Sequence, residues 1–164
     1  MLSKPGPEYI TDSYGQKYQL HIILESEEQL SVDIYDTQIV GYANCIIQHS
    51  NELSLADIRI FDQAIVFRST FQRIWVAAIQ RAPSRTKNYQ RRGLGTQLLQ
   101  WVIEYARARA LTRIVGDVVE QDLAQNPNLC QWYQKHGFSI TEPPPGAPKG
   151  IAKQIIMHIR RVDT

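Results

Sequence analysis

A short segment rich in arginine and glycine, Tyr89–Thr96, has the residue types needed to bind an anion. Two glycines, Gly93 and Gly95, are separated by one residue and stand where helical periodicity begins. Glycine lets the backbone approach a ligand closely, and the free N–H groups and dipole at a helix N-terminus favour a phosphate or diphosphate. The surroundings are basic, because residues 81–92 contain five cationic side chains and no acidic one. The segment therefore predicts a site for a polyphosphate ligand.

Two common phosphate-binding motifs are excluded. The chain contains no GxxxxGK[ST], which excludes a P-loop NTPase. Its GxG lacks a third glycine and does not follow a first βα crossover, so it does not match the dinucleotide-binding fingerprint. A GxG by itself also fits a loop in which glycines only turn the chain. Other parts of the sequence have to distinguish these alternatives.

A second stretch combines an asparagine, a tyrosine and a Gly-Phe pair. Asn126 precedes Tyr133 by seven residues, and Gly137 and Phe138 follow Tyr133 by four and five. A tyrosine hydroxyl, with an ordinary pKa of about 10, can act as the acid for a leaving group of similar basicity. In the alternative interpretation, Tyr133 is a core aromatic residue and Asn126 is simply the N-cap of a helix.

The two stretches together resemble the acyl-CoA-binding motif QxxGxG and the second signature of the GNAT superfamily of N-acyltransferases, over about residues 89–140. The resemblance implies that acetyl-CoA is the cosubstrate and that Gln90 opens the motif. It further implies that Asn126 contacts the pantetheine arm and that Tyr133 protonates the departing thiolate. The backbone amides implied to cradle the diphosphate are those of Arg91, Arg92, Gly93, Leu94, Gly95 and Thr96.

The general base is less well defined than the acid. An attacking amine must lose a proton, and the resemblance implies a carboxylate on or beside the fourth strand as the acceptor, directly or through water. Glu52, Asp57 and Asp62 all qualify by position, and Asp57 is the preferred candidate. Its alternative role is an outward-facing carboxylate on a strand.

The histidines and cysteines form no motif. The four histidines stand alone, without HxxxH or a Cys/His cluster, so no metal site is expected. Neither Cys45 nor Cys130 belongs to a CxxC or nucleophile motif, and both are expected to be reduced and buried. Direct acyl transfer is therefore favoured over a covalent enzyme intermediate.

Hydrophobic periodicity predicts the elements that position these groups. Residues 1–16 suggest a loose N-terminal arm, and four strands follow over 18–25, 30–35, 39–48 and 53–61, the last with a slip of phase near Asp57. The next elements are a helix over 95–110, a strand over 114–119, a helix from Asn126 to about His136, and strands over 138–140 and 151–159. We expect an α/β fold of the GNAT kind, with a mixed, mainly antiparallel central sheet flanked by helices.

In this family the fourth strand normally leads almost directly into the QxxGxG loop. In this chain residues 63–88 separate the two. An apolar stripe over Phe71–Ile79 predicts an inserted amphipathic helix. Loops of this size are usually functional or partly disordered. The insertion could fold over the acceptor site, form a homodimer contact, or pack on the sheet as an extra core helix. Alternatively, Ile74–Ile79 is itself the fourth strand, and then no insertion exists.

Length, composition and charge limit the class of protein. The chain has 164 residues, 43% of them hydrophobic and 21% charged, which suits one globular domain. No apolar run approaches the roughly 20 residues of a membrane-spanning helix, and the N-terminus has no secretory signal, so we expect a cytoplasmic protein. Residues 1–62 carry a net charge of −7, and residues 63–164 one of +9.

The distribution of charge along the chain indicates which kinds of acceptor and partner to expect. The acidic half favours a cationic acceptor, such as a polyamine, an aminoglycoside-like molecule or a peptide amine. The net charge of only +2, with a single aromatic residue in the basic segment, argues against nucleic-acid binding. The sequence thus predicts a single N-acetyltransferase domain that moves an acetyl group from acetyl-CoA directly to a primary amine. The alternative is a non-catalytic acyl-CoA-binding module that senses or scaffolds.

Overall fold

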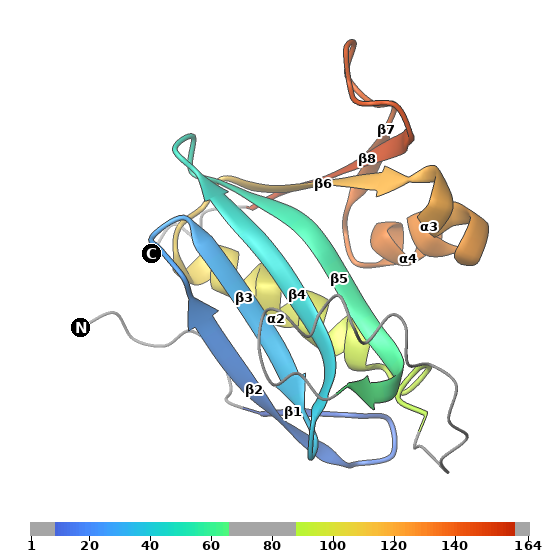
Figure 1. Cartoon of the computed structure of the whole chain (residues 1–164). Coiled ribbons are helices and arrows are strands. Elements are labelled where there is room, and N and C mark those ends of the chain that lie inside the picture. The colour runs from blue at the N-terminus through green and yellow to red at the C-terminus, as the bar shows by residue number, and fades with distance from the viewer. Residues whose placement is uncertain (1–8, 66–87, 160–164) are drawn as a thin grey trace.

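The computed structural model describes residues 9–65 and 88–159, without the side chains of 63–65. In this part of the chain one twisted sheet of eight strands forms the framework, in the spatial order β1-β2-β3-β4-β5-β6-β8-β7 (Figure 1). All neighbouring strands are antiparallel except β5 and β6, so the expected mixed, mainly antiparallel sheet is confirmed. The strands are β1 (Tyr9–Thr11), β2 (Lys17–Leu24), β3 (Gln29–Tyr35), β4 (Ile39–Gln48), β5 (Glu52–Ile65), β6 (Arg113–Val119), β7 (Ser139–Thr141) and β8 (Ile151–His158).

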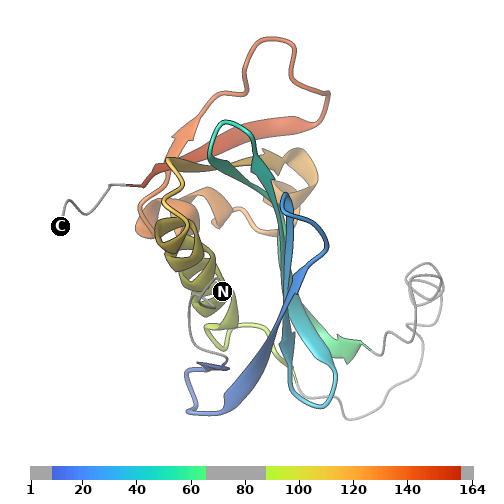
Figure 2. The same cartoon turned by 90° about the vertical axis from the view of Figure 1, so that its left-hand side faces the viewer.

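A long helix, α2 (Leu94–Ala108), covers one face of the sheet (Figure 2). Its apolar residues recur every three or four positions, as the sequence predicts, and form one buried stripe. Leu98, Leu99 and Val102 in this stripe are completely buried. Two short helices, α3 (Glu120–Gln125) and α4 (Leu129–Lys135), follow β6. No helix in residues 9–65 or 88–159 is long and apolar enough to span a membrane.

The parallel strands β5 and β6 pair over only four residues and then diverge (Figure 1). Their last paired residues are Leu55 and Gly116. One residue later the register between β5 and β4 slips, because Ala56 is an extra residue in a β-bulge. A bulge bends its strand and increases the local twist. Among residues 9–65 and 88–159, no strand pairs with the edge of β5 that faces β6 beyond Leu55. The backbones of the two strands diverge there in a V, which we call the opening between β5 and β6 (Figure 1).

The point of divergence favours a glycine. A Cβ atom on Gly116 would lie 3.0 Å from the carbonyl oxygen of Leu55 and 3.1 Å from Cγ1 of Ile155. At contacts this short, the neighbouring strand or side chain would have to shift by a few tenths of an ångström. Gly116 therefore lets β5, β6 and β8 approach closely where the opening starts.

Two elements were not predicted. Residues 9–11 were expected to belong to a loose arm, but they form β1, an edge strand paired with the start of β2. Only one of its three residues, Ile10, is buried, too few to produce a visible alternation. The helix α3 contains no buried residue, so it has no apolar stripe from which to predict it.

The helix that contains Tyr133 starts later than expected. Asn126 is not its N-cap but the C-cap of α3, and α4 begins at Leu129 with Asn128 as N-cap. The side-chain oxygen of Asn126 accepts a hydrogen bond from the amide of Asn128 at 3.3 Å, so Asn126 forms a turn between the two helices. Pro127 lies inside this turn.

The strand beside β6 is β5, which contains the predicted strand 53–61 and continues to Ile65. The inserted helix predicted at Phe71–Ile79, and the alternative strand at Ile74–Ile79, lie outside the described residues. The roles predicted for residues 66–87 therefore stay predictions.

Candidate active site

The N-terminus of α2 presents a row of free backbone amides. The first hydrogen bond of the helix runs from the amide of Gln97 to the carbonyl of Gly93, at 3.0 Å. Within the described part of the chain, the amides of Gly93, Leu94, Gly95 and Thr96 donate no hydrogen bond. Arg91 and Gly93 have left-handed conformations, with φ of 58° and 78°. Left-handed residues alternating with right-handed ones form concavities lined by N–H groups that bind anions. These four amides are therefore available to an anion, and the predicted anion cradle stays a prediction.

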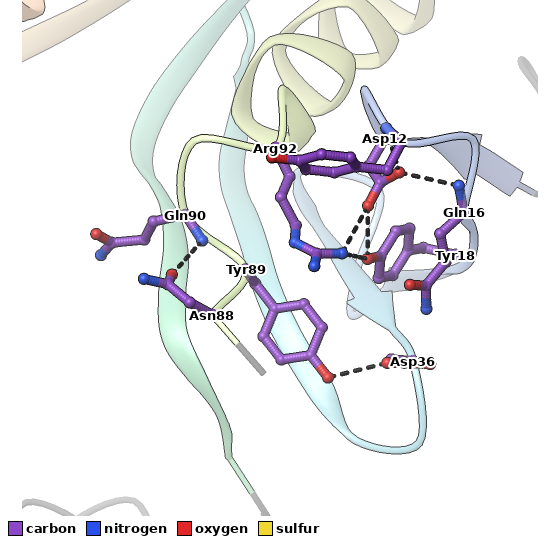
Figure 3. Close-up of polar contacts among 9 residues, drawn as sticks. Asp12, Gln16, Tyr18, Asp36, Asn88, Tyr89, Gln90 and Arg92 are labelled. Carbon is purple, nitrogen blue, oxygen red and sulfur yellow. Dashed lines mark hydrogen bonds and ion pairs between the residues drawn. The ribbon is translucent and has the colours of Figure 1, made fainter. Parts of the chain in front are cut away.

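The loop before α2 is anchored to the turn between β3 and β4 (Figure 3). Tyr89 is buried, and its hydroxyl donates a hydrogen bond to Oδ2 of Asp36 at 2.9 Å. Burial, and then this hydrogen bond, raise the pKa of Tyr89 to about 12. The next residue, Gln90, is exposed, and its amide donates to Oδ1 of Asn88 at 2.9 Å. The anchor therefore acts through Tyr89 and leaves the side chain of Gln90 on the surface.

The two arginines of the loop differ in environment. Arg91 is exposed, whereas the guanidinium of Arg92 donates hydrogen bonds to Oδ2 of Asp12 at 2.9 Å and to the hydroxyl of Tyr18 at 3.2 Å (Figure 3). It also lies 5.1 Å from the ring centre of Tyr14. The charge of Arg92 is thus paired with a buried carboxylate. Sequence reasoning missed this arrangement because the partner lies 80 residues away in a segment expected to be loose.

Helix α4 packs directly against the start of α2. Nε1 of Trp132 donates a hydrogen bond to Oγ1 of Thr96 at 3.2 Å. A Cβ atom on Gly95 would lie 3.6 Å from Cγ1 of Ile60 and 3.8 Å from Cζ2 of Trp132. The start of α2, β5 beyond its bulge, and α4 therefore meet at one place, beside the opening between β5 and β6.

Tyr133 lies on α4 next to this junction. It is 6% exposed, and its ring packs edge-on against Trp132 and Phe138, with ring centres 4.8 Å and 5.4 Å away. Within the described residues its hydroxyl makes no hydrogen bond. Burial, followed by the negative charges of Asp122 and Asp57, raises the pKa of Tyr133, so the hydroxyl stays protonated well above neutral pH.

Among the three candidate bases, Asp57 differs from the other two in its position and its partners. It directly follows the bulge, is half-buried, and accepts a hydrogen bond from the hydroxyl of Tyr42 at 2.6 Å. Glu52 lies at the opposite end of the paired segment and forms a 2.7 Å ion pair with Arg113, which lowers its pKa. Asp62 is exposed. The charge of Asp57, unlike those of the other two, is among those that raise the pKa of Tyr133.

Three further residues singled out in the sequence, Asn126, Cys45 and Cys130, have no visible role in the site. Asn126 is exposed in the turn before α4. Both cysteines are free. Cys45 is buried, and burial raises the pKa of its thiol to about 12. Cys130 is only half-buried, so the expectation that both cysteines are buried is wrong for Cys130. Among the described residues, no group of three or more metal-ligating side chains occurs.

Comparison with known proteins connects this geometry to a family. The model of the acetyltransferase (GNAT) family matches residues 2–138. Similar solved structures include the PaiA N-acetyltransferase of Thermoplasma acidophilum in complex with coenzyme A. The two chains share 12% sequence identity with a TM-score of 0.53, over 80% of this chain and 62% of that one. The chain thus spans less than two thirds of the length of the Thermoplasma protein. No curated protein sequence matches the chain.

Two further structures share the fold. A GNAT family acetyltransferase from Elizabethkingia anophelis, with acetyl-CoA bound, has 16% identity and a TM-score of 0.53, over 87% of this chain and 98% of that one. The ribosomal-protein-S18-alanine N-acetyltransferase of Escherichia coli has 18% identity and a TM-score of 0.52, over 85% of this chain and 76% of that one. At these identities the likeness establishes the fold and leaves the acceptor open.

Proposed function

This chain belongs to the GNAT acetyltransferase family, and we propose that it transfers an acetyl group from acetyl-CoA directly to a primary amine. The main support is the convergence of three features. The free amides from Gly93 to Thr96, the unpaired edge of β5 beyond Leu55 and the hydroxyl-bearing Tyr133 all belong to elements that meet beside one opening. Each feature alone has an ordinary structural explanation, but together they suit a long ligand with an anionic centre and a reactive end.

The residues present fit acetyl-CoA, which when bound supplies an acetyl group activated as a thioester. The amides at the start of α2 and the helix dipole suit the diphosphate. The unpaired edge of β5 offers N–H and C=O groups to the amides of the pantetheine arm, as a sheet edge does to an added strand. Arg91 is exposed at the cradle and adds positive charge there. In this proposal Asn126 contacts the pantetheine arm from the turn before α4.

Two proton movements accompany the transfer. A bond forms between the amine nitrogen and the acetyl carbon while the carbon–sulfur bond breaks, so the nitrogen loses a proton and the sulfur gains one. We assign proton acceptance to Asp57, directly or through a water molecule, and proton donation to the hydroxyl of Tyr133. A backbone N–H at the free edge of β5 is suited to stabilise the negative charge that develops on the carbonyl oxygen.

The raised pKa of Tyr133 refines its role. With a pKa above its ordinary value, the hydroxyl is a weaker acid than an exposed phenol, but it is protonated in every molecule at neutral pH. Burial also raises the pKa of a thiol, so a thiolate leaving within the same site becomes a stronger base. Tyr133 therefore acts first as a hydrogen-bond donor to the developing thiolate and then as its proton source.

Binding of acetyl-CoA is tested with a charge placed in the cradle. We expect calorimetric titration of the wild-type chain to show micromolar binding, and Gly95→Glu to weaken it at least tenfold, because the added carboxylate repels the diphosphate. Gln100→Glu is the matched control, since it adds the same charge at an exposed position of α2 and should leave the affinity unchanged. Equal affinities of Gly95→Glu and the wild type, with both folded, would show that the cradle is not the binding site.

Catalysis is tested at Tyr133. We expect Tyr133→Phe to lower kcat by about 100-fold or more, the usual contribution of a general acid, while the Kd for acetyl-CoA stays unchanged. Tyr9→Phe, at a tyrosine that is 54% exposed on β1, is the control and should retain full activity. Unchanged turnover in Tyr133→Phe would reject the assignment. Tight acetyl-CoA binding without turnover of any amine would instead favour the non-catalytic acyl-CoA-binding module.

The acceptor is proposed to carry a positive charge besides its reacting amine. Residues 114–134, which run from β6 through α3 into α4, contain Asp117, Glu120 and Asp122 but no lysine or arginine. Asp57 adds a further carboxylate close enough to affect Tyr133. These four carboxylates, which we call the acidic rim, attract a cation and repel an anion.

A pair of acceptors of equal length tests this charge preference. We expect kcat/KM to be at least tenfold higher for 1,4-diaminobutane than for butylamine, and the ratio to fall as salt screens the rim. Equal values for the two amines at low ionic strength would reject a cationic acceptor while leaving the acetyl transfer itself intact.

A further inference from the structure

We propose that the turn between β1 and β2, residues 12–16, is a latch that sets the affinity for acetyl-CoA, with Asp12 and Arg92 as its positioning residues. This inference rests on the proposed function, because it concerns the cradle at the start of α2. Neither side chain is assigned a contact with acetyl-CoA. Their effect is to hold the cradle in its binding geometry before the ligand arrives.

The carboxylate of Asp12 organises the turn and joins it to the loop. Oδ1 accepts hydrogen bonds from the amides of Tyr14 and Gln16, both at 2.9 Å. Oδ2 accepts hydrogen bonds from the hydroxyl of Tyr18 and the guanidinium of Arg92, also both at 2.9 Å. The side chain of Asp12 is fully shielded from solvent, whereas that of Arg92 is 20% exposed. A carboxylate with four donors cannot move without breaking several bonds, so it is a rigid anchor.

The latch also holds the backbone that precedes α2. The amide of Ser13 donates a hydrogen bond to the carbonyl of Arg92 at 2.9 Å. In a continuing α-helix that carbonyl would accept the amide of Thr96, four residues further along. Because Gly93 is left-handed, the helix does not extend backwards past it, and the amide of Ser13 takes this carbonyl instead of the amide of Thr96. The amide of Thr96 is therefore left without an intrahelical partner and available to an anion.

The side chain of Arg92 points toward the turn between β1 and β2. Figure 3 shows it directed toward Asp12 and Tyr18 on one side of the loop, with Gln90 on the other. Its positive charge is paired with Asp12, so its contribution to acetyl-CoA binding is mainly positional. Burial alone would raise the pKa of Asp12, but hydrogen bonds from Gln16, Tyr18, Tyr14 and Arg92 lower it overall, so the pair is ionised at neutral pH.

A single substitution separates positioning from simple charge attraction. Asp12→Asn makes the chain more positive by one unit and releases Arg92 near an anion site. If Arg92 acted only through its charge, acetyl-CoA would bind Asp12→Asn as tightly as the wild type or more tightly. The latch predicts the opposite: the loop loses its anchor, and binding weakens in spite of the added positive charge.

The experiment is a calorimetric titration of the full chain with acetyl-CoA, together with steady-state kinetics. We expect Asp12→Asn and Arg92→Gln each to raise the Kd and KM for acetyl-CoA by about tenfold, with kcat at saturation within about twofold of the wild type. Arg113→Gln is the matched control, because it breaks another ion pair between distant segments, Arg113–Glu52, and should leave the Kd unchanged. Urea unfolding verifies that each variant is folded under the conditions of the titration.

A milder variant keeps the test decisive if Asp12→Asn does not fold. Tyr18→Phe removes the hydroxyl that bonds both Asp12 and Arg92 but retains both charges, and we expect a Kd raised by about two- to fivefold. Unchanged or tighter binding in the folded latch variants overturns the latch while leaving the acetyl-CoA site intact. A wild-type chain that binds no acetyl-CoA overturns both the latch and the proposed function.

Discussion

The parting of β5 from β6 is the constraint on which the rest of the site depends. Parallel strands that stayed paired would satisfy each other's backbone groups and leave no space for a ligand between them. Here the pairing stops after Leu55 and Gly116, where the bulge at Ala56 bends β5 away. Beyond this point Ile60 of β5 lies beside Gly95 at the start of α2, α4 is hydrogen-bonded to the same turn of α2, and the charge of Asp57 raises the pKa of Tyr133.

The second requirement is a loop held in a conformation that leaves its amides unpaired. Every α-helix begins with N–H groups that have no intrahelical partner, but they converge on one anion only if the preceding loop holds its conformation. Two anchors hold this loop. Tyr89 ties the loop to Asp36 in the turn after β3, and Arg92 ties it to Asp12 in the turn after β1. The N-terminal strands thus do more than complete the sheet, since two of their turns shape the anion cradle.

The sequence predicted those features that arise from local patterns. The slip of phase near Asp57 corresponds to the bulge, and the spacing of Gly93 and Gly95 corresponds to the free amides. Features that depend on distant partners left no such pattern. Asp12 lies in a segment without periodicity, and its role exists only through contact with a residue 80 positions away. The start of α4 was misplaced because Asn126 and Asn128 both suit a cap beside Pro127, and only packing selects Asn128.

The central claim is that the free amides at the start of α2 bind the diphosphate of acetyl-CoA, and residue-resolved hydrogen exchange tests it most directly. In the free protein, the amides of Gly93, Leu94, Gly95 and Thr96 should exchange rapidly, whereas that of Gln97, bonded to the carbonyl of Gly93, should exchange slowly. We predict that saturating acetyl-CoA slows the four free amides by at least about tenfold and changes Gln97 little. Binding that protects other amides and leaves these four fast would contradict the account.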